Sequence, residues 1–167
     1  MFINSREFVI KDRNMVKHND HGFTFVFFFT PDCVYCNDVK PAFVHLSKVI
    51  RGCNFFFCDV SDNYLPSIST HSKTPITYVP FLLLFANGQV IGQYFPDEDN
   101  PANNVQRMAD FIKTTTSQYV KKNVPGGSVS TVTEPEKPVY SYGIPYNRSA
   151  RRVCKLYNDA YTQPVKK

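Results

Sequence analysis

The sequence predicts an α/β fold in which helices cover a central mixed sheet, and three observations support this class. The runs FTFVFFF at 23–29 and CNFFFCD at 53–59 are short, apolar and rich in aromatic residues, as in strands that are buried on both faces. Between them, the segment 33–50 places apolar residues at helical spacing. Asn87-Gly88 separates two further apolar runs, which is the strongest short signal of a β-hairpin.

The first half of the chain is predicted to alternate between strands and helices. The strands lie at 2–4, 23–29 and 53–59, and the helices lie at 5–17 and 33–50. Ser5 is the predicted N-cap of the first helix. Gly52 ends the second helix, whose apolar positions are Val39, Phe43, Leu46 and Ile50.

The second half begins with a polar segment at 61–78 that contains two prolines, so we expect a loop with at most one helical turn. The hairpin follows, with strands at 81–85 and 89–94. A final amphipathic helix is predicted over 103–120, with its apolar face formed by Val105, Met108, Ala109 and Ile112.

Composition divides the chain into a core domain and an extension. All fifteen Phe lie at or before Phe111, whereas five of the ten Tyr lie after Tyr119. We therefore predict a domain over 1–122, an extended linker rich in Pro, Gly, Ser, Thr and Tyr over 123–147, and a basic tail over 148–167. Residues 148–161 recover a helical pattern, which predicts a short amphipathic helix.

The charge is concentrated in the extension. Residues 1–122 carry 12 Lys and Arg against 11 Asp and Glu, whereas residues 123–167 carry 7 against 3. Seven cations are weak evidence for nucleic acid, so we do not expect it as a partner. Tyrosine and arginine are common anchors of protein interfaces, and we predict that the tail docks on a protein partner through Tyr146, Arg148, Arg152, Tyr157 and Tyr161.

The cellular compartment is predicted from three features: the N-terminal residues, the length of the apolar runs and the number of cysteines. The first six residues lack the charged and then apolar pattern of a secretory signal, and no apolar run approaches the length of a membrane span. Five cysteines is an odd number for a secreted disulfide framework. We therefore expect a soluble cytoplasmic protein, in which a disulfide is transient and catalytic.

The motif Cys33-Val34-Tyr35-Cys36 lies where the strand 23–29 gives way to the helix 33–50. Two thiols at positions i and i+3 of a first helical turn are close enough to form a disulfide. The first thiol also faces the unpaired N–H groups and the positive end of the helix dipole, which favour the thiolate. This placement predicts a redox dithiol with Cys33 as the exposed nucleophile and Cys36 as the resolving thiol.

With this motif in place, residues 1–122 resemble the thioredoxin superfamily, and thioredoxin itself most closely. Besides the strand that leads into the dithiol, the resemblance rests on Pro41, on Val79-Pro80 at the start of a strand, and on LLLFANGQV at 82–90. It implies a three-layer α/β/α sandwich with a central mixed sheet. It also implies that Pro80 is a cis-proline beside the dithiol and that protein disulfides are the substrates.

The resemblance also assigns the residues around the dithiol. Val34, Tyr35, Val79 and Pro80 are expected to shape the substrate groove. Asp32 stands where thioredoxins usually have tryptophan, and its carboxylate is expected to oppose ionisation of the neighbouring thiol. Phe27 occupies the position of the family's buried acid. No flavin or nicotinamide fingerprint is present, so we expect no cofactor and electrons from a protein or a small thiol.

A metal site is the alternative for the cysteines. Together with Cys53 and Cys58, the motif reads C-x2-C-x16-C-x4-C, which superficially resembles a four-cysteine zinc site. However, Cys53 and Cys58 have opposite parity along one strand and should point to different faces. The histidines have no metal-like spacing, and we predict no metal site from His18, His21, His45 and His71.

A non-enzymatic function is the alternative for the whole chain. In this hypothesis the fold is a scaffold and residues 123–167 tether it to an assembly. The bias toward Phe, Tyr, Asn and Lys resembles proteins of large DNA viruses with AT-rich genomes. In such viruses thioredoxin-like folds occur both as virion redox factors and as minor structural proteins, so a virion or minor capsid location is the alternative to the cytoplasm.

Overall fold

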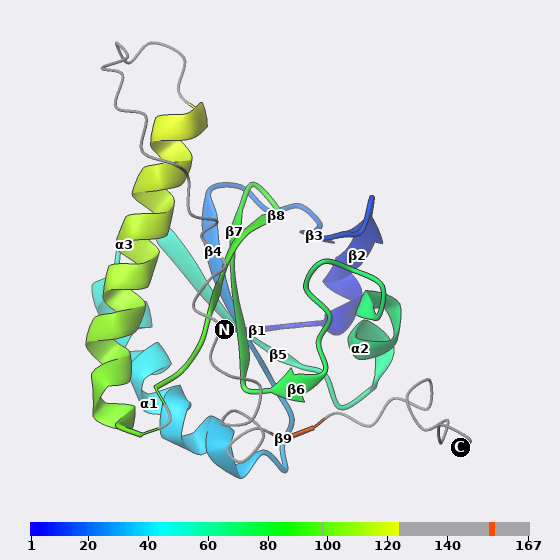
Figure 1. Ribbon diagram of the computed structural model, residues 1–167, viewed down its shortest axis with the longest axis horizontal. Helices are drawn as coiled ribbons and strands as arrows, with labels where there is room; N and C mark the ends of the chain where they lie inside the picture. Colours follow the sequence, from blue (N-terminus) through cyan, green and yellow to red (C-terminus); the bar gives the residue numbers. More distant parts are fainter. Residues whose placement is uncertain (98, 124–153, 156–167) are drawn as a thin grey trace, which may run out of the picture.

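A computed structural model describes residues 1–97, 99–123 and 154–155 (Figure 1). Its main element is a seven-stranded sheet with the order β1-β5-β4-β7-β8-β3-β2. The strands of this sheet are β1 (Phe2–Ile3), β2 (Phe8–Lys11), β3 (Asn14–Lys17), β4 (Phe23–Phe29), β5 (Cys53–Asp59), β7 (Phe81–Ala86) and β8 (Gln89–Tyr94). A second sheet pairs β6 (Tyr78–Val79) with β9 (Cys154–Lys155).

The main sheet is mixed, and helices cover both of its faces. β5 is parallel to β1 and β4, whereas all other neighbours in this sheet are antiparallel. The helices α1 (Val34–Val49) and α3 (Asn104–Asn123) pack together on one face, and α2 (Tyr64–Ser69) lies on the other (Figure 1). The predicted α/β class and thioredoxin-like sandwich are therefore confirmed.

Phenylalanine fills the space between the sheet and α1. The ring of Phe43 on α1 lies with its centroid 4.9 to 5.4 Å from those of Phe25 and Phe27 on β4 and Phe55 and Phe57 on β5. Aromatic pairs at these separations add to the free energy of burial. Because both faces of β4 are buried, its sequence shows a continuous apolar run, and β4 and β5 have the predicted bounds. The predicted burial of both faces is wrong for β5, in which only Phe55 and Cys58 are buried.

The hairpin of β7 and β8 turns at Asn87-Gly88, as predicted. Both residues have positive φ angles, 48° and 80°, which suits the twist of a two-residue hairpin loop. A Cβ atom at Gly88 would collide with the backbone carbonyl of Lys17. The Lys17 N–H donates a hydrogen bond to the Gly88 carbonyl at 2.8 Å, so this turn also attaches the edge strands to the sheet.

The predicted helix over 5–17 is wrong. Only Ser5–Glu7 is helical, as a single 3-10 turn called η1, and its N-cap is Asn4 rather than Ser5. The remainder forms the hairpin of β2 and β3, which turns at Asp12 and Arg13 with φ angles of 51° and 62°. The apolar stripe was imperfect at helical spacing, and the hairpin instead extends the edge of the sheet.

Other helices are close to their predicted bounds, except in the tail. The polar segment 61–78 contains the short helix α2, and a 3-10 turn, η2 (Pro101–Asn103), precedes α3.

The predicted helix over 148–161 is wrong at Cys154–Lys155, which form the strand β9. Since an isolated helix of this length is marginal in water, pairing with another strand readily outweighs the helical preference. Its other residues lie outside the described part of the chain.

Candidate active site

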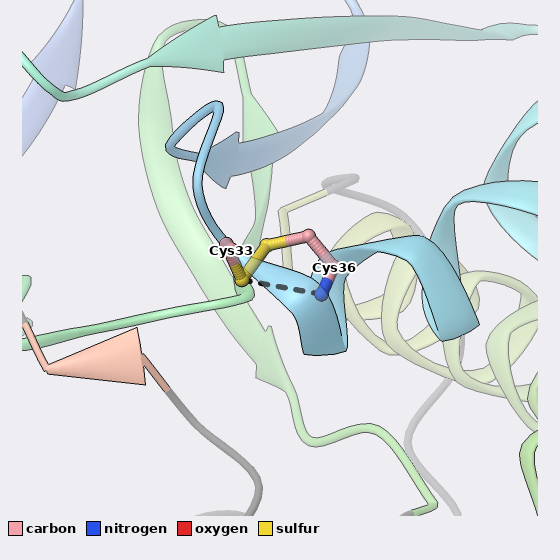
Figure 2. The surroundings of a disulfide bond; sticks show 2 residues. All are labelled: Cys33 and Cys36. Atoms are coloured by element: carbon pink, nitrogen blue, oxygen red, sulfur yellow. Dashed lines mark hydrogen bonds between the residues drawn. A yellow bond between two sulfur atoms is a disulfide. The ribbon is translucent and has the colours of Figure 1, made fainter.

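Cys33 and Cys36 form a disulfide at the start of α1 (Figure 2). Cys33 is the N-cap, with extended backbone angles, and Cys36 lies in the first turn. The Cα atoms are 5.4 Å apart, within the usual range for a disulfide. The Cys36 N–H donates a hydrogen bond to the Cys33 sulfur at 3.2 Å, so this sulfur takes the place of a capping oxygen.

Both sulfurs are buried in the oxidised protein. Cys33 is 2% exposed and Cys36 is fully buried, so the expectation of an exposed Cys33 is wrong for this state. The capping position explains the difference, because the hydrogen bond and the disulfide both turn the Cys33 sulfur toward the first turn of α1.

The residues beside the dithiol differ strongly in exposure. Val34 is 68% exposed, whereas Tyr35 is half-buried. Asp32 is exposed and lies immediately before the N-cap. The site therefore combines a buried disulfide with an apolar and an acidic side chain at the surface.

The strand β6 leads to the other predicted part of the groove. Val79 ends β6 and is fully buried, in the same apolar cluster as Cys33 and Cys36. The Val79-Pro80 peptide bond is cis, and Pro80 is also buried. In Figure 1, β6 lies at the end of the sheet where α1 begins. The structure thus brings Val79 to the dithiol end of the molecule.

Beneath α1, the position of the family's buried acid holds an aromatic ring. Phe27 is fully buried, and its ring packs against those of Phe43 and Phe57. No carboxylate at this position is available to exchange a proton with Cys36.

The other described cysteines of the core lie on β5 and are free thiols. Cys53 is in register with Phe23 at one end of β4, and Cys58 is in register with Phe28 at the other. Burial raises the pKa of each thiol to about 12, so both are neutral at physiological pH. Their separation along the strand does not bring four sulfurs to one point.

The histidines do not approach one another as ligands would. The side chains of His18, His21, His45 and His71 are all exposed. Within residues 1–97, 99–123 and 154–155, no three His, Cys, Asp or Glu side chains lie close enough to hold a metal ion.

One contact near this site has no signal in the sequence, and several predicted docking residues lie outside the described part of the chain. The missed contact is the pairing of β9 with β6, because a two-residue strand leaves no periodic signal. The predicted docking residues outside the described part of the chain are Tyr146, Arg148, Arg152, Tyr157 and Tyr161. The tail partner, and with it the assembly function, stays a prediction.

Comparison with known families identifies the domain. The family model for thioredoxin matches residues 9–122. An uncharacterized protein, 196R, of Invertebrate iridescent virus 6 is 35% identical over 145 residues, which cover 84% of this chain and 75% of that protein. The uncharacterized protein 020R of Invertebrate iridescent virus 3 is 28% identical over 144 residues, which cover 83% of this chain and 79% of that protein. Both relatives are viral, and neither name states a function.

Solved structures give more distant likenesses. The oxidised form of mitochondrial thioredoxin 3 from Saccharomyces cerevisiae is 23% identical with a TM-score of 0.44, and the match covers 57% of this chain and 80% of that chain. Human ERp44 is 21% identical with a TM-score of 0.49, and the match covers 68% of this chain and 32% of that chain. None of the helices in the described part of the chain has the length and apolar character needed to cross a membrane.

Proposed function

Because the chain belongs to the thioredoxin family, we propose that it is a thiol–disulfide oxidoreductase that acts on protein disulfides through Cys33 and Cys36. One observation supports this function above the others. Cys33 caps α1, and its sulfur accepts the N–H hydrogen bond of Cys36 while it is joined to Cys36 in a disulfide. A structural thiol needs neither the helix terminus nor a partner three residues away.

Cys33 is the nucleophile in this proposal. In the reduced form its sulfur lies beside the free N–H groups and the positive dipole end of α1, and both favour a thiolate. The first turn of α1 contains no acidic residue that would weaken this effect from within the helix. The carboxylate of Asp32 lies just outside the helix and disfavours the Cys33 thiolate, an effect that acts through solvent.

The exchange proceeds in two substitutions at sulfur. The Cys33 thiolate attacks one sulfur of a client disulfide, a Cys33–client disulfide forms, and the second client sulfur leaves as a thiolate that takes up a proton. Cys36 then loses its proton and attacks the Cys33 sulfur, which releases the other client thiolate. The client gains two electrons, and the protein loses two as Cys33–Cys36 forms. A thiol donor returns the disulfide to the dithiol.

The surrounding residues would hold the client during this exchange. Val34 offers an exposed apolar contact beside Cys33, and Tyr35 adds a partly exposed ring. Val79 and Pro80 offer backbone rather than side chains, because both side chains are buried. Recognition through backbone groups suits an enzyme that accepts more than one client sequence.

Turnover of insulin with dithiothreitol as the electron donor tests the proposal. We expect the full-length protein to accelerate the reduction of insulin, and we expect Cys33→Ser to abolish the acceleration because the nucleophile is lost. Cys53→Ser is the matched control, since that thiol is neutral at the assay pH and lies at the far end of β4 from the dithiol. Acceleration by Cys33→Ser equal to that of the wild type would refute the function.

A further inference from the structure

We propose that β9 is an internal client of the dithiol, in which Cys154 exchanges disulfides with Cys33 of the same chain. The proposal rests on the proposed function, because it uses the same two thiols. It goes further by identifying a partner strand and a third redox-active cysteine.

The pairing of β9 with β6 places Cys154 at one defined register position. The two strands are antiparallel, with Tyr78 opposite Lys155 and Val79 opposite Cys154. Val79 is the residue before the cis-proline, and it is fully buried in the apolar core of the domain, to which Cys33 and Cys36 also belong. The fifth cysteine of the chain is therefore in register with the buried residue of β6 that precedes the cis-proline.

The two views agree on this placement. In Figure 1, β9 lies beside β6 at the end of the sheet from which α1 starts. In Figure 2, the salmon arrow of β9 lies in the surroundings of the Cys33–Cys36 disulfide, to the lower left of Cys33. A segment more than thirty residues beyond α3 thus returns to the dithiol end of the molecule.

Backbone pairing explains why this segment binds here. A strand edge presents N–H and C=O groups that another extended segment can satisfy with little demand on its sequence. In the described part of the chain, β6 forms a two-stranded sheet with β9. A pair of two residues is weak by itself. Attachment through the same chain compensates, because it raises the effective concentration to the order of millimolar.

The other free cysteines of the core are poorer partners for Cys33. Cys53 lies at the opposite end of β5 from the dithiol. Cys58 lies at the same end but is fully buried within the core. Burial raises the pKa of both thiols to about 12, whereas an attacking thiol must ionise.

The exchange balances without any added oxidant. The Cys154 thiolate attacks the Cys33 sulfur, a Cys33–Cys154 disulfide forms, and the Cys33–Cys36 bond breaks. Cys36 leaves as a thiolate and takes up a proton. The reverse attack by Cys36 restores the first disulfide and frees Cys154, so the chain holds two electrons fewer than the fully reduced form throughout.

Trapping the exchange in the full-length protein tests the inference. Cys36→Ser removes the competing resolving thiol, so Cys33, once activated by oxidised glutathione in dilute protein, should link to Cys154 within one chain. Non-reducing peptide mapping should identify Cys33–Cys154 as the main disulfide. The link should disappear in Cys36→Ser/Cys154→Ser and persist in Cys36→Ser/Cys53→Ser. A main link from Cys33 to Cys53, to Cys58, to glutathione alone or to a second copy would overturn the inference.

Hydrogen exchange tests docking separately from the disulfide. The amides of β6 should exchange roughly tenfold more slowly in Cys154→Ser, which keeps the strand, than in Cys154→Pro/Lys155→Pro, which cannot pair. Equal exchange rates in both variants would overturn the inference. If insulin turnover fails while the Cys33–Cys154 link forms, the proposed function is wrong and this inference stands. If insulin is reduced but no such link forms, the inference alone is wrong.

Discussion

Cys33 is subject to two opposing influences on its charge. Burial of the sulfur disfavours a thiolate, whereas the N–H hydrogen bond and the helix dipole favour one. The thiols of Cys53 and Cys58 are also buried, but neither lies at the start of a helix, and burial raises the pKa of each to about 12. In the proposed function, the capping position is therefore what distinguishes the reactive thiol from the two inert ones.

Alkylation of the reduced protein tests this difference. Between pH 7 and pH 8 we expect iodoacetamide to modify Cys33 much faster than Cys53 or Cys58. A thiol with a pKa of about 12 has a thiolate fraction on the order of one in ten thousand at pH 8, and the fraction rises only as the pH approaches 12. Mass spectrometry of the tryptic peptides measures the three rates. Equal rates at pH 8 would contradict the assignment of Cys33 as the reactive thiol.

The carboxylate of Asp32 should weaken the reactivity of Cys33. Asp32 is exposed, so solvent screens it and the effect should be small. At low ionic strength we expect Asp32→Asn to raise the alkylation rate of Cys33 by roughly twofold, and high salt should remove the difference. Asp38→Asn, an exposed change further along α1, is the control and should have less effect. A rate that is unchanged at low salt would exclude the role given to Asp32.

Among the elements, the connection from β8 to α3 is held by one carboxylate. Asp97 accepts hydrogen bonds from the N–H of Asn100 at 3.0 Å and from the side chain of Asn103 at 3.3 Å, and its carboxylate lies 2.8 Å from Arg107. The side chain of Asn104 accepts hydrogen bonds from the Asp97 N–H and from Tyr94. This network fixes the start of α3, which packs against α1.

Asp97 should make the stability of the protein depend on acid pH. The hydrogen bond from the Asn100 N–H, followed by those from Asn103 and Arg107, lowers the pKa of Asp97 below its ordinary value. Its contribution is therefore complete above the unfolded pKa of about 4 and is lost as the pH falls through the folded pKa. We expect Asp97→Asn to lower the free energy of unfolding by roughly 1 kcal/mol at pH 7. Urea denaturation at several pH values measures this.

The matched change for that experiment is Asp110→Asn. Asp110 is exposed on α3 and accepts one hydrogen bond, from Gln106. It should change the free energy of unfolding by less than about 0.5 kcal/mol. A difference between wild type and Asp97→Asn that persists unchanged below pH 2 would show that charge is not the cause.

On the scale of the whole molecule, the predictable parts of the fold are those with a local physical signal. The strand β4 shows its burial as a continuous apolar run, and the hairpin at Asn87-Gly88 shows its turn directly. The strand β5 has a similar run but is only partly buried, with Phe55 and Cys58 as its buried residues. The hairpin of β2 and β3 was missed because Asp12 and Arg13 adopt positive φ angles without a glycine. Its alternating pattern is also short enough to be confused with a helix.

The features of the candidate site were also predictable only where the sequence has a local signal. The position of Cys33-Val34-Tyr35-Cys36 at a strand-to-helix junction was predictable, because a continuous apolar run precedes it and apolar residues at helical spacing follow it. The burial of Cys33 was not, since it depends on how the capping sulfur turns toward Cys36. The pairing of β9 with β6 joins segments more than seventy residues apart, and no local pattern encodes such a contact.

The aromatic core should determine the stability of the whole domain. Phe43 is almost fully buried and contacts rings from two central strands. We expect Phe43→Ala to lower the free energy of unfolding by about 3–5 kcal/mol, because it removes apolar contacts and leaves a cavity. Val44→Ala, at an exposed neighbour on α1, should have an effect below about 1 kcal/mol. Chemical denaturation of the reduced proteins compares the two; equal losses would contradict the placement of the core.

A single-turnover experiment tests most directly whether this dithiol reduces protein disulfides. The fully reduced, full-length protein is mixed anaerobically with excess insulin in the absence of any other thiol, and both proteins are then alkylated and mapped. We predict that insulin loses one disulfide for each Cys33–Cys36 disulfide formed, while Cys53 and Cys58 remain thiols. Insulin that stays fully oxidised beside a fully reduced Cys33 and Cys36 would contradict the proposed function.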